Sequence, residues 1–390
     1  MPALKTGLAL GNRRVAAIPP SAIRAVDNQI SKIPGIIKLT LGEPDFPVSE
    51  HIKAATKAAI DADYSHYAPS FGYLPLREKI AAYLAKRFDA HYDPATEVVV
   101  TVGATEAIHA AIAGLFNPGD TIIIPTPTFP LYEAVAHLAA LNVVLVNTAP
   151  DFLFTAAKLQ ATLAAHPEAK GLVLNYPSNP TGVTYAPAEL QALAQVVKAS
   201  NLVVLSDEIY AELTYDTKHL SMGALVPEQT LLISGFSKSH AMTGYRVGYF
   251  AGPAALVALV GKMHQFMVTC GASPMMMAAQ EALATNFDDA SEMKAIYQQR
   301  RDLMLKALTA AGFTAPRPAG AFYIFAKLPA GQVDDVAFVY DLAAKAKVGV
   351  VPGSVFGPGG EGYVRLSYAA ATADLIEAGE RIQRYVATKE

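Results

Sequence analysis

Short runs of apolar residues alternate with segments of helical periodicity between residues 98 and 252. The runs that predict strands cover residues 98–102, 121–124, 143–146, 171–175, 202–205 and 231–233. Between the first two runs, residues 105–116 place their apolar side chains on one helical face, and Asn117-Pro118-Gly119 ends the helix. Strands that alternate with helices are typical of a parallel sheet covered on both faces. The pattern therefore predicts one large, doubly wound α/β domain.

Amphipathic and strand-like segments flank this region on both sides. They predict helices at residues 76–88, 290–311 and 333–347 and strands at residues 321–328 and 363–368. The elements after the large domain read as a smaller α+β domain. The predicted division is an N-terminal arm with part of the small domain at 1–45, the large domain at 46–285, and the C-terminal small α+β domain at 286–390.

The composition is that of a folded chain. Hydrophobic residues make up 52% of the 390 residues and charged residues 17%, which excludes a disordered chain. The formal net charge of -3 argues against nucleic acid or an anionic membrane as the main partner. Cys270 is the sole cysteine and His240 has no spaced ligand partner, so we expect neither a disulfide nor a metal site. The apolar stretch near the N-terminus is too short and too broken for a signal sequence, so we expect a soluble, cytoplasmic protein.

The segment from Ser234 to Arg246, SGFSKSHAMTGYR, carries three groups that suit a phosphate-bearing carbonyl cofactor. A lysine reacts with a carbonyl when burial or nearby cations lower its pKa, and a bound phosphate needs hydroxyl and guanidinium donors. Lys238, Ser237 and Arg246 supply the amine, the hydroxyl and the guanidinium. A surface loop with one basic residue at each end is the alternative interpretation of this segment alone.

Candidate groups gather where the predicted strands end. Gly103, Asn175 and Asp207 directly follow or close their strands, and Lys238 comes a few residues after another. Ligands of open α/β sheets bind beyond the carboxyl ends of the strands, so we expect these groups to share one site. An unpaired charge at Asp207 would be costly after an apolar strand, and a protonated pyridinium nitrogen would be a suitable partner. A solvated turn at Asp207 and Glu208 is the alternative.

Three further features carry chemistry. The Gly103-Ala104-Thr105 turn can bind an anion through backbone N–H groups and the Thr105 hydroxyl, or it can simply cap a helix. Asn179, in the loop YPSNPTG, could donate a hydrogen bond to a phenolate oxygen on a bound ring. Arg365, inside the apolar strand YVRLSY, should meet a carboxylate, which would belong to a ligand or to a protein Asp or Glu.

Taken together, these segments resemble the class I and II aminotransferases of the fold-type I pyridoxal 5'-phosphate (PLP) superfamily. The resemblance runs from about Leu39 to Tyr368. The motifs that carry it, in the family's order, are LGEPDF, HYAPSFGYLPLRE, VGATEA, NYPSNPTG, LSDEIY, SGFSKSHAMTGYRVG, PAGAFY and YVRLSYA. The resemblance implies a large, doubly wound, mostly parallel sheet domain and a smaller α+β domain formed by both termini.

The resemblance also implies roles for individual residues. Lys238, Asp207 and Tyr210 would form the catalytic group, with Lys238 as the lysine that holds PLP as a Schiff base and Asp207 as the partner of the pyridinium nitrogen. The residues that would bind the phosphate are Gly103, Ala104, Thr105, Ser237, Arg246 and, from the other subunit of a homodimer, Tyr67. Those that would contact the ring are Phe129, Asn179 and Tyr210. Those that would bind the substrate are Gly42, Asn179 and Arg365, of which Arg365 would grip the α-carboxylate.

Two positions depart from the family pattern. Many relatives have a serine three residues before the lysine as a phosphate contact, whereas this chain has Gly235, so Ser234 or the backbone would have to replace it. Many relatives have Tyr or Trp at the ring-stacking position, whereas this chain has Phe129, which keeps the aromatic face and lacks a polar handle.

The implied reaction is a ping-pong transfer of an amino group from an L-amino acid to a 2-oxo acid such as 2-oxoglutarate. Aromatic donors are favoured because no arginine is evidently placed to bind a distal carboxylate. The alternatives are N-acetyl-diaminopimelate, methionine or aspartate as donor, and a carbon-sulfur β-lyase. A non-catalytic regulator is disfavoured because the residues ahead of Gly42 leave no room for a DNA-binding domain. A Ser-Lys hydrolase is ranked last because it would leave Asp207 and Arg365 without roles.

Overall fold

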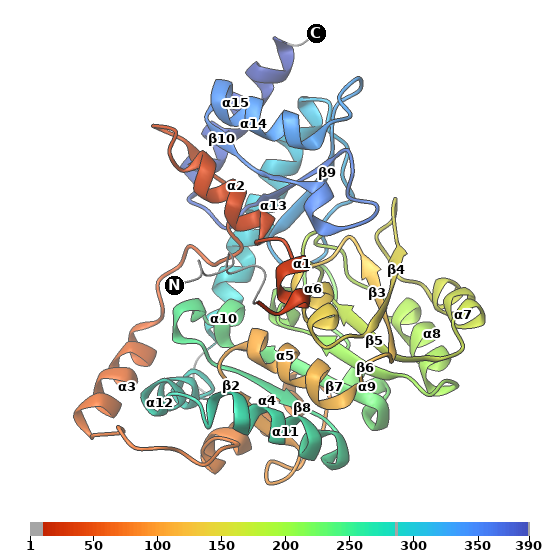
Figure 1. Ribbon diagram of the computed structural model, residues 1–390. Coiled ribbons are helices and arrows are strands. Elements are labelled where there is room, and N and C mark those ends of the chain that lie inside the picture. The colour runs from red at the N-terminus through yellow and green to blue at the C-terminus, as the bar shows by residue number, and fades with distance from the viewer. Residues whose placement is uncertain (1–10, 285–287, 389–390) are drawn as a thin grey trace, which may run out of the picture.

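The centre of the molecule is a sheet of seven strands. The computed structural model describes residues 11–284 and 288–388, and there the strand order is β2-β8-β7-β6-β5-β3-β4 (Figure 1). Strand β8 is antiparallel to both of its neighbours, and the other pairs are parallel. The strands are β2 Val98–Thr101, β3 Thr121–Thr126, β4 Asn142–Asn147, β5 Ala169–Asn175, β6 Val203–Asp207, β7 Thr230–Gly235 and β8 Gly248–Ala251.

The predicted mostly parallel α/β sheet is confirmed, with one strand that the apolar runs did not indicate. Strand β8 has only four residues, and two of them, Gly248 and Ala251, are poor strand formers. All four residues are nevertheless buried, because β8 lies between β2 and β7. Pairing with two neighbours therefore forms a strand where the local signal is weak.

Helices cover both faces of the sheet, which explains the continuous apolar runs. Successive side chains of a strand point to opposite faces, so Val173 packs with α5, α6 and α11, whereas Leu172 and Leu174 pack with α7, α8 and α9. The helices of these two layers are α5 Ala104–Leu115, α6 Leu131–Leu138, α7 Ala156–Ala165, α8 Pro187–Lys198, α9 Met222–Leu225 and α11 Ala254–Val268. A further apolar cluster at the β2 edge is formed with α3 Glu50–Asp61, α4 Leu74–Phe88 and α12 Ser273–Ala282.

A second sheet of three antiparallel strands, in the order β11-β12-β9, lies at the other end of the molecule (Figure 1). Beside it, β1 pairs in parallel with β10, so segments from both ends of the chain meet here. The strands are β1 Ile37–Lys38, β9 Tyr323–Lys327, β10 Val348–Gly349, β11 Val351–Pro352 and β12 Tyr363–Ser367. The helices around them are α2 Ala22–Ile30, α13 Asp289–Ala310, α14 Asp335–Ala346 and α15 Thr372–Ala387. The domain boundaries given above stay a prediction.

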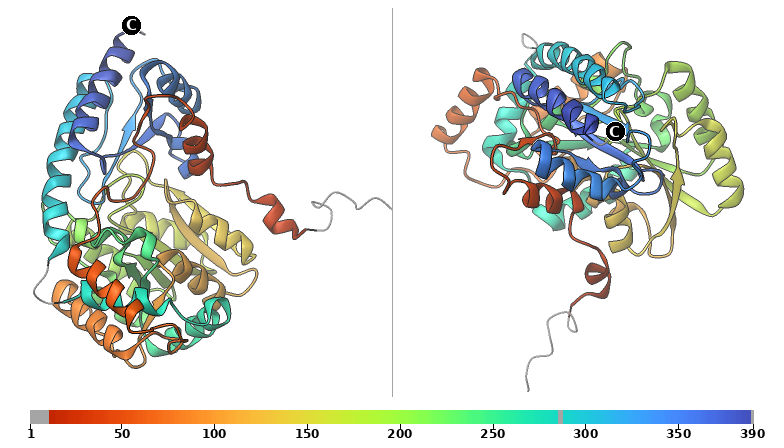
Figure 2. Two further views of the ribbon diagram at one scale, coloured as in Figure 1. Left: turned by 90° about the vertical axis from the view of Figure 1, so that its left-hand side faces the viewer. Right: turned by 90° about the horizontal axis from the view of Figure 1, so that it is seen from above.

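The segment before α2 differs from the rest of the chain. Helix α1, Arg13–Ala17, has no buried residue, and Figure 2 shows it reaching outward from the body of the molecule. Within the described ranges, no helix combines the length and the apolar character that a membrane span requires.

Candidate active site

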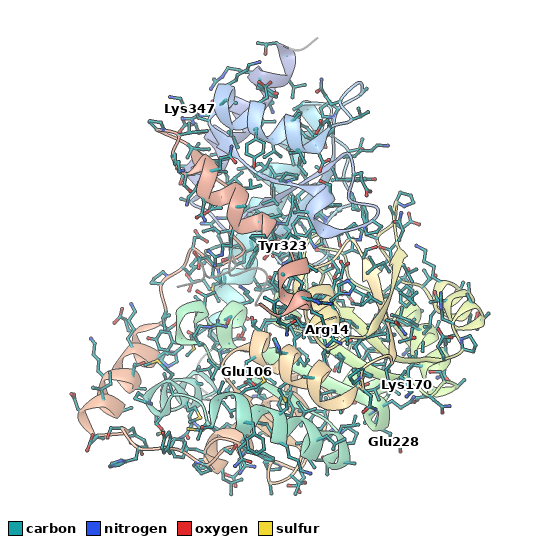
Figure 3. The ribbon with its side chains drawn as sticks, in the orientation of Figure 1. Arg14, Glu106, Lys170, Glu228, Tyr323 and Lys347 are labelled. Atoms are coloured by element: carbon teal, nitrogen blue, oxygen red, sulfur yellow. The ribbon has the colours of Figure 1, made fainter. Side chains whose placement is uncertain are left out.

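A cavity of about 640 Å³ lies at the carboxyl ends of the parallel strands of the central sheet. The opposite wall is formed by residues between 21 and 43 and by Tyr323 and Arg365 of the second sheet. Figure 3 shows Tyr323 between the upper and lower parts of the molecule. The predicted site residues that line the cavity are Gly42, Ala104, Thr105, Phe129, Asn179, Asp207, Tyr210, Ser237, Lys238, Arg246 and Arg365.

The topology of the sheet explains this convergence. Asp207 ends β6, and its neighbour across the ladder, Asn175, ends β5. Lys238 lies in α10, Phe236–Ser239, which begins directly after β7. Ala104 begins α5 shortly after β2. Because these strands run in the same direction, their carboxyl ends meet at one edge of the sheet, and the groups that follow them face the same cavity.

Asp207 is a buried carboxylate that two uncharged donors hold, and the charge of Lys238 acts on it without direct contact. The Tyr132 hydroxyl donates to Oδ2 at 2.7 Å and the Ile209 amide donates to Oδ1 at 3.1 Å. Burial raises the pKa of Asp207 to about 6, although the bonds from Tyr132 and Ile209 oppose this shift. Within residues 11–284 and 288–388, no Lys, Arg or His forms an ion pair with it. A protonated ring nitrogen fits such a group because it would supply the absent positive charge.

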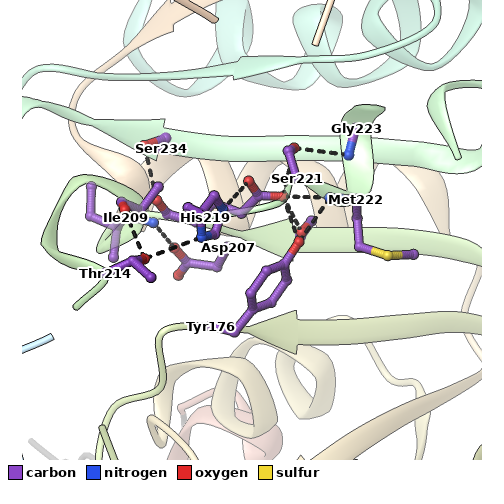
Figure 4. Close-up of polar contacts among 12 residues, drawn as sticks. Tyr176, Asp207, Ile209, Thr214, His219, Ser221, Met222, Gly223 and Ser234 are labelled. Atoms are coloured by element: carbon purple, nitrogen blue, oxygen red, sulfur yellow. Dashed lines mark hydrogen bonds and ion pairs between the residues drawn. The ribbon is translucent and has the colours of Figure 1, made fainter. Parts of the chain in front are cut away.

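Glu208, the residue after Asp207, takes part in a buried hydrogen-bond network, and Figure 4 labels its partners His219 and Ser221 near Asp207. Its carboxylate accepts from Ser206 Oγ at 2.7 Å and lies 2.8 Å from His219 Nε2. Asp207 and Glu208 are both buried, so the alternative of a solvated turn pair is wrong. The network fixes the chain at the end of β6, where Asp207 stands.

Lys238 extends into the cavity from α10. Its Nζ donates to the Gly42 carbonyl oxygen at 2.6 Å. Burial lowers the pKa of Lys238 to about 8; Arg246 and Arg365 act in the same direction, and Glu43 opposes them. A substantial fraction of the amine is thus neutral near pH 8, as reaction with a carbonyl requires.

The turn between β2 and α5 forms a cradle beside Arg246. Gly103 has φ +78°, which favours glycine, and a Cβ atom there would lie 2.5 Å from Arg246 Nη2 and displace the guanidinium. Arg246 is itself held by a bond from Nη1 to the Thr243 carbonyl oxygen at 2.9 Å. Ser237 and the first turn of α5 complete a set of hydroxyl, guanidinium and helix N-terminal donors that suits a phosphate.

The packing around Gly235 explains one departure from the family pattern. A Cβ atom at Gly235 would lie 2.8 Å from the Gly248 Cα atom of β8, so a serine does not fit there without a backbone shift. The Ser234 hydroxyl donates to the Glu208 carbonyl oxygen at 3.4 Å, and Ser234 is not among the residues that line the cavity. Ser237 therefore lines the cavity, whereas Ser234, in β7, does not.

Arg365 is fully buried, yet it forms no ion pair among the described residues. Nη1 donates to Asn179 Oδ1 at 2.9 Å and Nη2 donates to the Thr40 carbonyl oxygen. Nε is buried without a hydrogen-bond partner among the described residues. Structural pairing with a protein carboxylate, the alternative left open by the sequence, is therefore wrong, and a ligand carboxylate fits this cation.

The remaining residues that the resemblance assigns to the ring come from three segments. The Tyr210 and Tyr323 hydroxyls are 2.8 Å apart. The backbone N–H of Asn179 donates to Asn175 Oδ1 at 2.9 Å, which positions Asn179. Phe129 is half-buried in the cavity wall and packs edge-on against Tyr132, with ring centroids 6.0 Å apart. Sequence reasoning missed the contribution of Tyr132, although it stands only three residues after Phe129.

Tyr67 does not reach this cavity within one chain. Its side chain is 86% exposed, and it is not a lining residue. Its expected role across a subunit interface stays a prediction. Arg24, which the sequence did not single out, does line the cavity from α2.

Comparisons with known proteins agree with this geometry. The family model described as aminotransferase class I and II matches residues 34–381. A probable N-acetyl-LL-diaminopimelate aminotransferase of Bacillus subtilis is 41% identical over 97% of this chain and 96% of its own length. The aromatic-amino-acid aminotransferase 2 of Thermococcus litoralis is 35% identical over 97% of this chain and 98% of its own. The solved structure of the aspartate aminotransferase from Thermus thermophilus with maleate has a TM-score of 0.91 at 35% identity, covering 96% and 99% of the two chains.

These findings confirm the resemblance, the fold class, the cofactor and the general enzyme class that the sequence indicated. The orphaned Arg365 Nε, the unpaired Asp207 carboxylate and the cradle at Gly103 are the features of this chain that fit PLP and an amino acid. The chain belongs to the class I and II aminotransferases, which are PLP-dependent enzymes of fold type I acting on amino acids and 2-oxo acids.

Proposed function

We propose that this protein transfers the amino group of an L-amino acid, with aromatic donors favoured, to a 2-oxo acid such as 2-oxoglutarate by a ping-pong mechanism. One observation carries the proposal. A single cavity holds the Lys238 amine, the unpaired Asp207 carboxylate and the buried Arg365 guanidinium. These are the groups that a PLP-dependent transfer requires to bind the cofactor, to hold its charge and to orient the substrate.

Lys238 has two tasks in this proposal. Bound PLP supplies an aldehyde that exchanges amines and a ring that accepts electrons from the substrate Cα atom. Lys238 holds the cofactor between turnovers and, once displaced by the substrate amine, carries the proton away from Cα. Its lowered pKa, about 8, leaves the amine able to accept that proton near neutral pH.

Asp207 keeps the proton of the ring nitrogen in place. The Tyr132 hydroxyl and the Ile209 amide hold the carboxylate in place, so its position does not depend on an ion pair with the protein. Tyr210, hydrogen-bonded to Tyr323, and Asn179 face the cavity where they can donate to the phenolic oxygen. Ala104, Thr105, Ser237 and Arg246, which line the cavity, would hold the phosphate, and the turn at Gly103 positions the first two beside Arg246.

Arg365 fixes the substrate by its α-carboxylate. A guanidinium with a buried, unpartnered N–H gains a charged hydrogen bond when a carboxylate arrives, and the burial excludes competing water. A carboxylate bound there would hold the substrate Cα atom in the cavity that Lys238 also lines.

Arg24 supports a dicarboxylic partner such as 2-oxoglutarate. No arginine for a distal carboxylate was evident from the sequence, but Arg24 of α2 lines the cavity with an exposed side chain. Within the described residues it forms no ion pair. Beside it, Ile23 and Leu41 offer apolar surface to an aromatic or aliphatic side chain. One site can therefore take both partners of a ping-pong exchange.

N-acetyl-LL-diaminopimelate is a second candidate donor. A Bacillus subtilis relative that is 41% identical carries that name, and this compound has a distal carboxylate that Arg24 could meet. We also propose a homodimer in which Tyr67 of each chain completes the other chain's phosphate site, as its exposure supports. The cytoplasmic location stays a prediction.

A panel of amino donors with 2-oxoglutarate as acceptor tests the proposal. We expect phenylalanine or tyrosine to give the highest kcat/KM. Arg24→Gln should raise the KM for 2-oxoglutarate about tenfold or more, the loss expected for one charged hydrogen bond, and leave the KM for pyruvate unchanged. Arg13→Gln, an exposed arginine of α1 outside the cavity lining, is the matched control. Absence of transamination with every donor would refute the function, and equal effects on both acceptors would refute the role of Arg24.

A further inference from the structure

His264 and Glu106 form a buried charged pair behind the phosphate cradle. His264 lies in α11 and is fully buried; Glu106, labelled in Figure 3, is the third residue of α5 and is 8% exposed. His264 Nδ1 lies 3.2 Å from both carboxylate oxygens of Glu106, and Nε2 lies 2.8 Å from the Ser70 carbonyl oxygen. Neither residue lines the cavity, so neither touches the cofactor or the substrate.

The partners of His264 determine its protonation. A carbonyl oxygen and a carboxylate oxygen only accept hydrogen bonds, so these two contacts favour a ring in which both nitrogens carry protons, the imidazolium. Burial lowers the pKa of His264, but the hydrogen bond and charge of Glu106 and the Ser70 carbonyl outweigh it and leave this pKa raised. Of the described charged groups, Glu106 is the one in direct contact with it.

Glu106 in turn holds the backbone that forms the cradle. Its Oε2 accepts from the Val102 amide at 3.0 Å, directly before Gly103 with its φ of +78°. A carboxylate at the third position of a helix commonly binds the amide just ahead of the helix, and here this bond fixes the direction of the turn. The same carboxylate, however, places a negative charge in the first turn of the helix that faces the phosphate, where it repels an anion.

We propose that His264 is a positioning residue for cofactor binding, whose imidazolium both fixes Glu106 and cancels its charge next to the phosphate cradle. Through the Ser70 carbonyl it also anchors the segment that carries Tyr67. The proposal rests on the phosphate site proposed above. In this proposal the ion pair lets the Glu106 carboxylate hold the Val102 amide without repelling the phosphate of the bound cofactor.

A double-mutant cycle that removes the two charges tests the proposal on the full chain after its cofactor has been removed. PLP and pyridoxal, which lacks the phosphate, are titrated at pH 6.5, where the raised pKa of His264 favours the imidazolium, into the wild type, His264→Gln, Glu106→Gln and the double variant. His264→Gln should weaken PLP binding about tenfold, the effect of one uncompensated charge near a helix N-terminus, and leave pyridoxal binding unchanged. Adding Glu106→Gln should restore PLP affinity to within about threefold of wild type, because the uncompensated charge is then absent.

A merely structural role gives a different result. If His264 only fills space, both ligands weaken together and the double variant binds no better than the single ones, which overturns the proposal. If His264→Gln does not fold, Glu106→Gln alone decides: the proposal requires PLP affinity, relative to pyridoxal, at or above the wild-type value, and a lower one overturns it. Arg246→Gln is the reference for the phosphate site itself. If that variant does not favour pyridoxal over PLP, the proposed phosphate site fails independently of His264.

Discussion

Replacing Tyr132 by phenylalanine should make cofactor binding depend more steeply on pH. Tyr132 is 1% exposed and its hydroxyl donates to Asp207 at 2.7 Å, so phenylalanine keeps the packing and removes one hydrogen bond. This bond holds the pKa of Asp207 down against burial, and the resulting pKa is about 6. A hydrogen bond to a charged group contributes about 1.5–3 kcal/mol, and one pKa unit corresponds to about 1.36 kcal/mol.

The variant should therefore raise the pKa of Asp207 by about 1–2 units. The cofactor ring binds the ionised carboxylate, so the ionised fraction scales the affinity. At pH 7 that fraction is high for a pKa of about 6 and falls about twofold to tenfold when the pKa rises by one or two units. At pH 9 Asp207 is mostly ionised in both proteins, so the ratio of the two dissociation constants should approach one.

Absorbance titration of the cofactor-free proteins with PLP from pH 6 to pH 9 measures this ratio. Ionisation of PLP and of Lys238 is common to both proteins and cancels. Tyr185→Phe, which removes a hydroxyl that donates to the Phe154 carbonyl oxygen outside the cavity, is the matched control and should show a ratio near one throughout. A ratio for Tyr132→Phe that stays constant over this range, or that grows toward pH 9, would contradict the assignment of Asp207 as the titrating partner.

Three further predictions follow from the proposed residue roles. Lys238→Ala should retain PLP through the phosphate cradle and lose turnover, and borohydride reduction of the wild type should leave a cofactor-derived mass on Lys238, with another lysine as the contrary result in mass spectrometry. Because the pKa of Lys238 is lowered to about 8, the rate of PLP capture should increase as pH rises through about 8 and then level off, which stopped-flow absorbance can follow. Mixing Tyr67→Phe with Lys238→Ala chains under exchange conditions should regain activity in hybrids with one intact site; activity equal to the sum of the separate variants would count against a shared site.

Much of the fold could be predicted from local pattern. The middles of strands β3 and β5 are covered on both faces, so burial selects consecutive apolar residues there and the runs appear in the sequence. Strand β8 was not predicted, because it is short and its burial comes from its neighbours in the sheet. The site residues inside recognisable motifs, such as Asp207 and Lys238, were predicted for a similar reason, since parallel strands bring their carboxyl ends to one edge.

The sequence alone therefore determined the fold class, the family and the groups that would meet at the strand ends, because hydrophobic periodicity and compact motifs are local. The tertiary structure decided which partners those groups have. Tyr132 meets Asp207 across 75 positions, Arg365 meets Asn179 across 186, and His264 meets Glu106 across 158. Arg24 reaches the cavity only because α2 packs beside the second sheet. Such contacts follow from how distant elements pack, and a single hydrogen bond imposes no pattern on the residues around it, so no local signal reveals them.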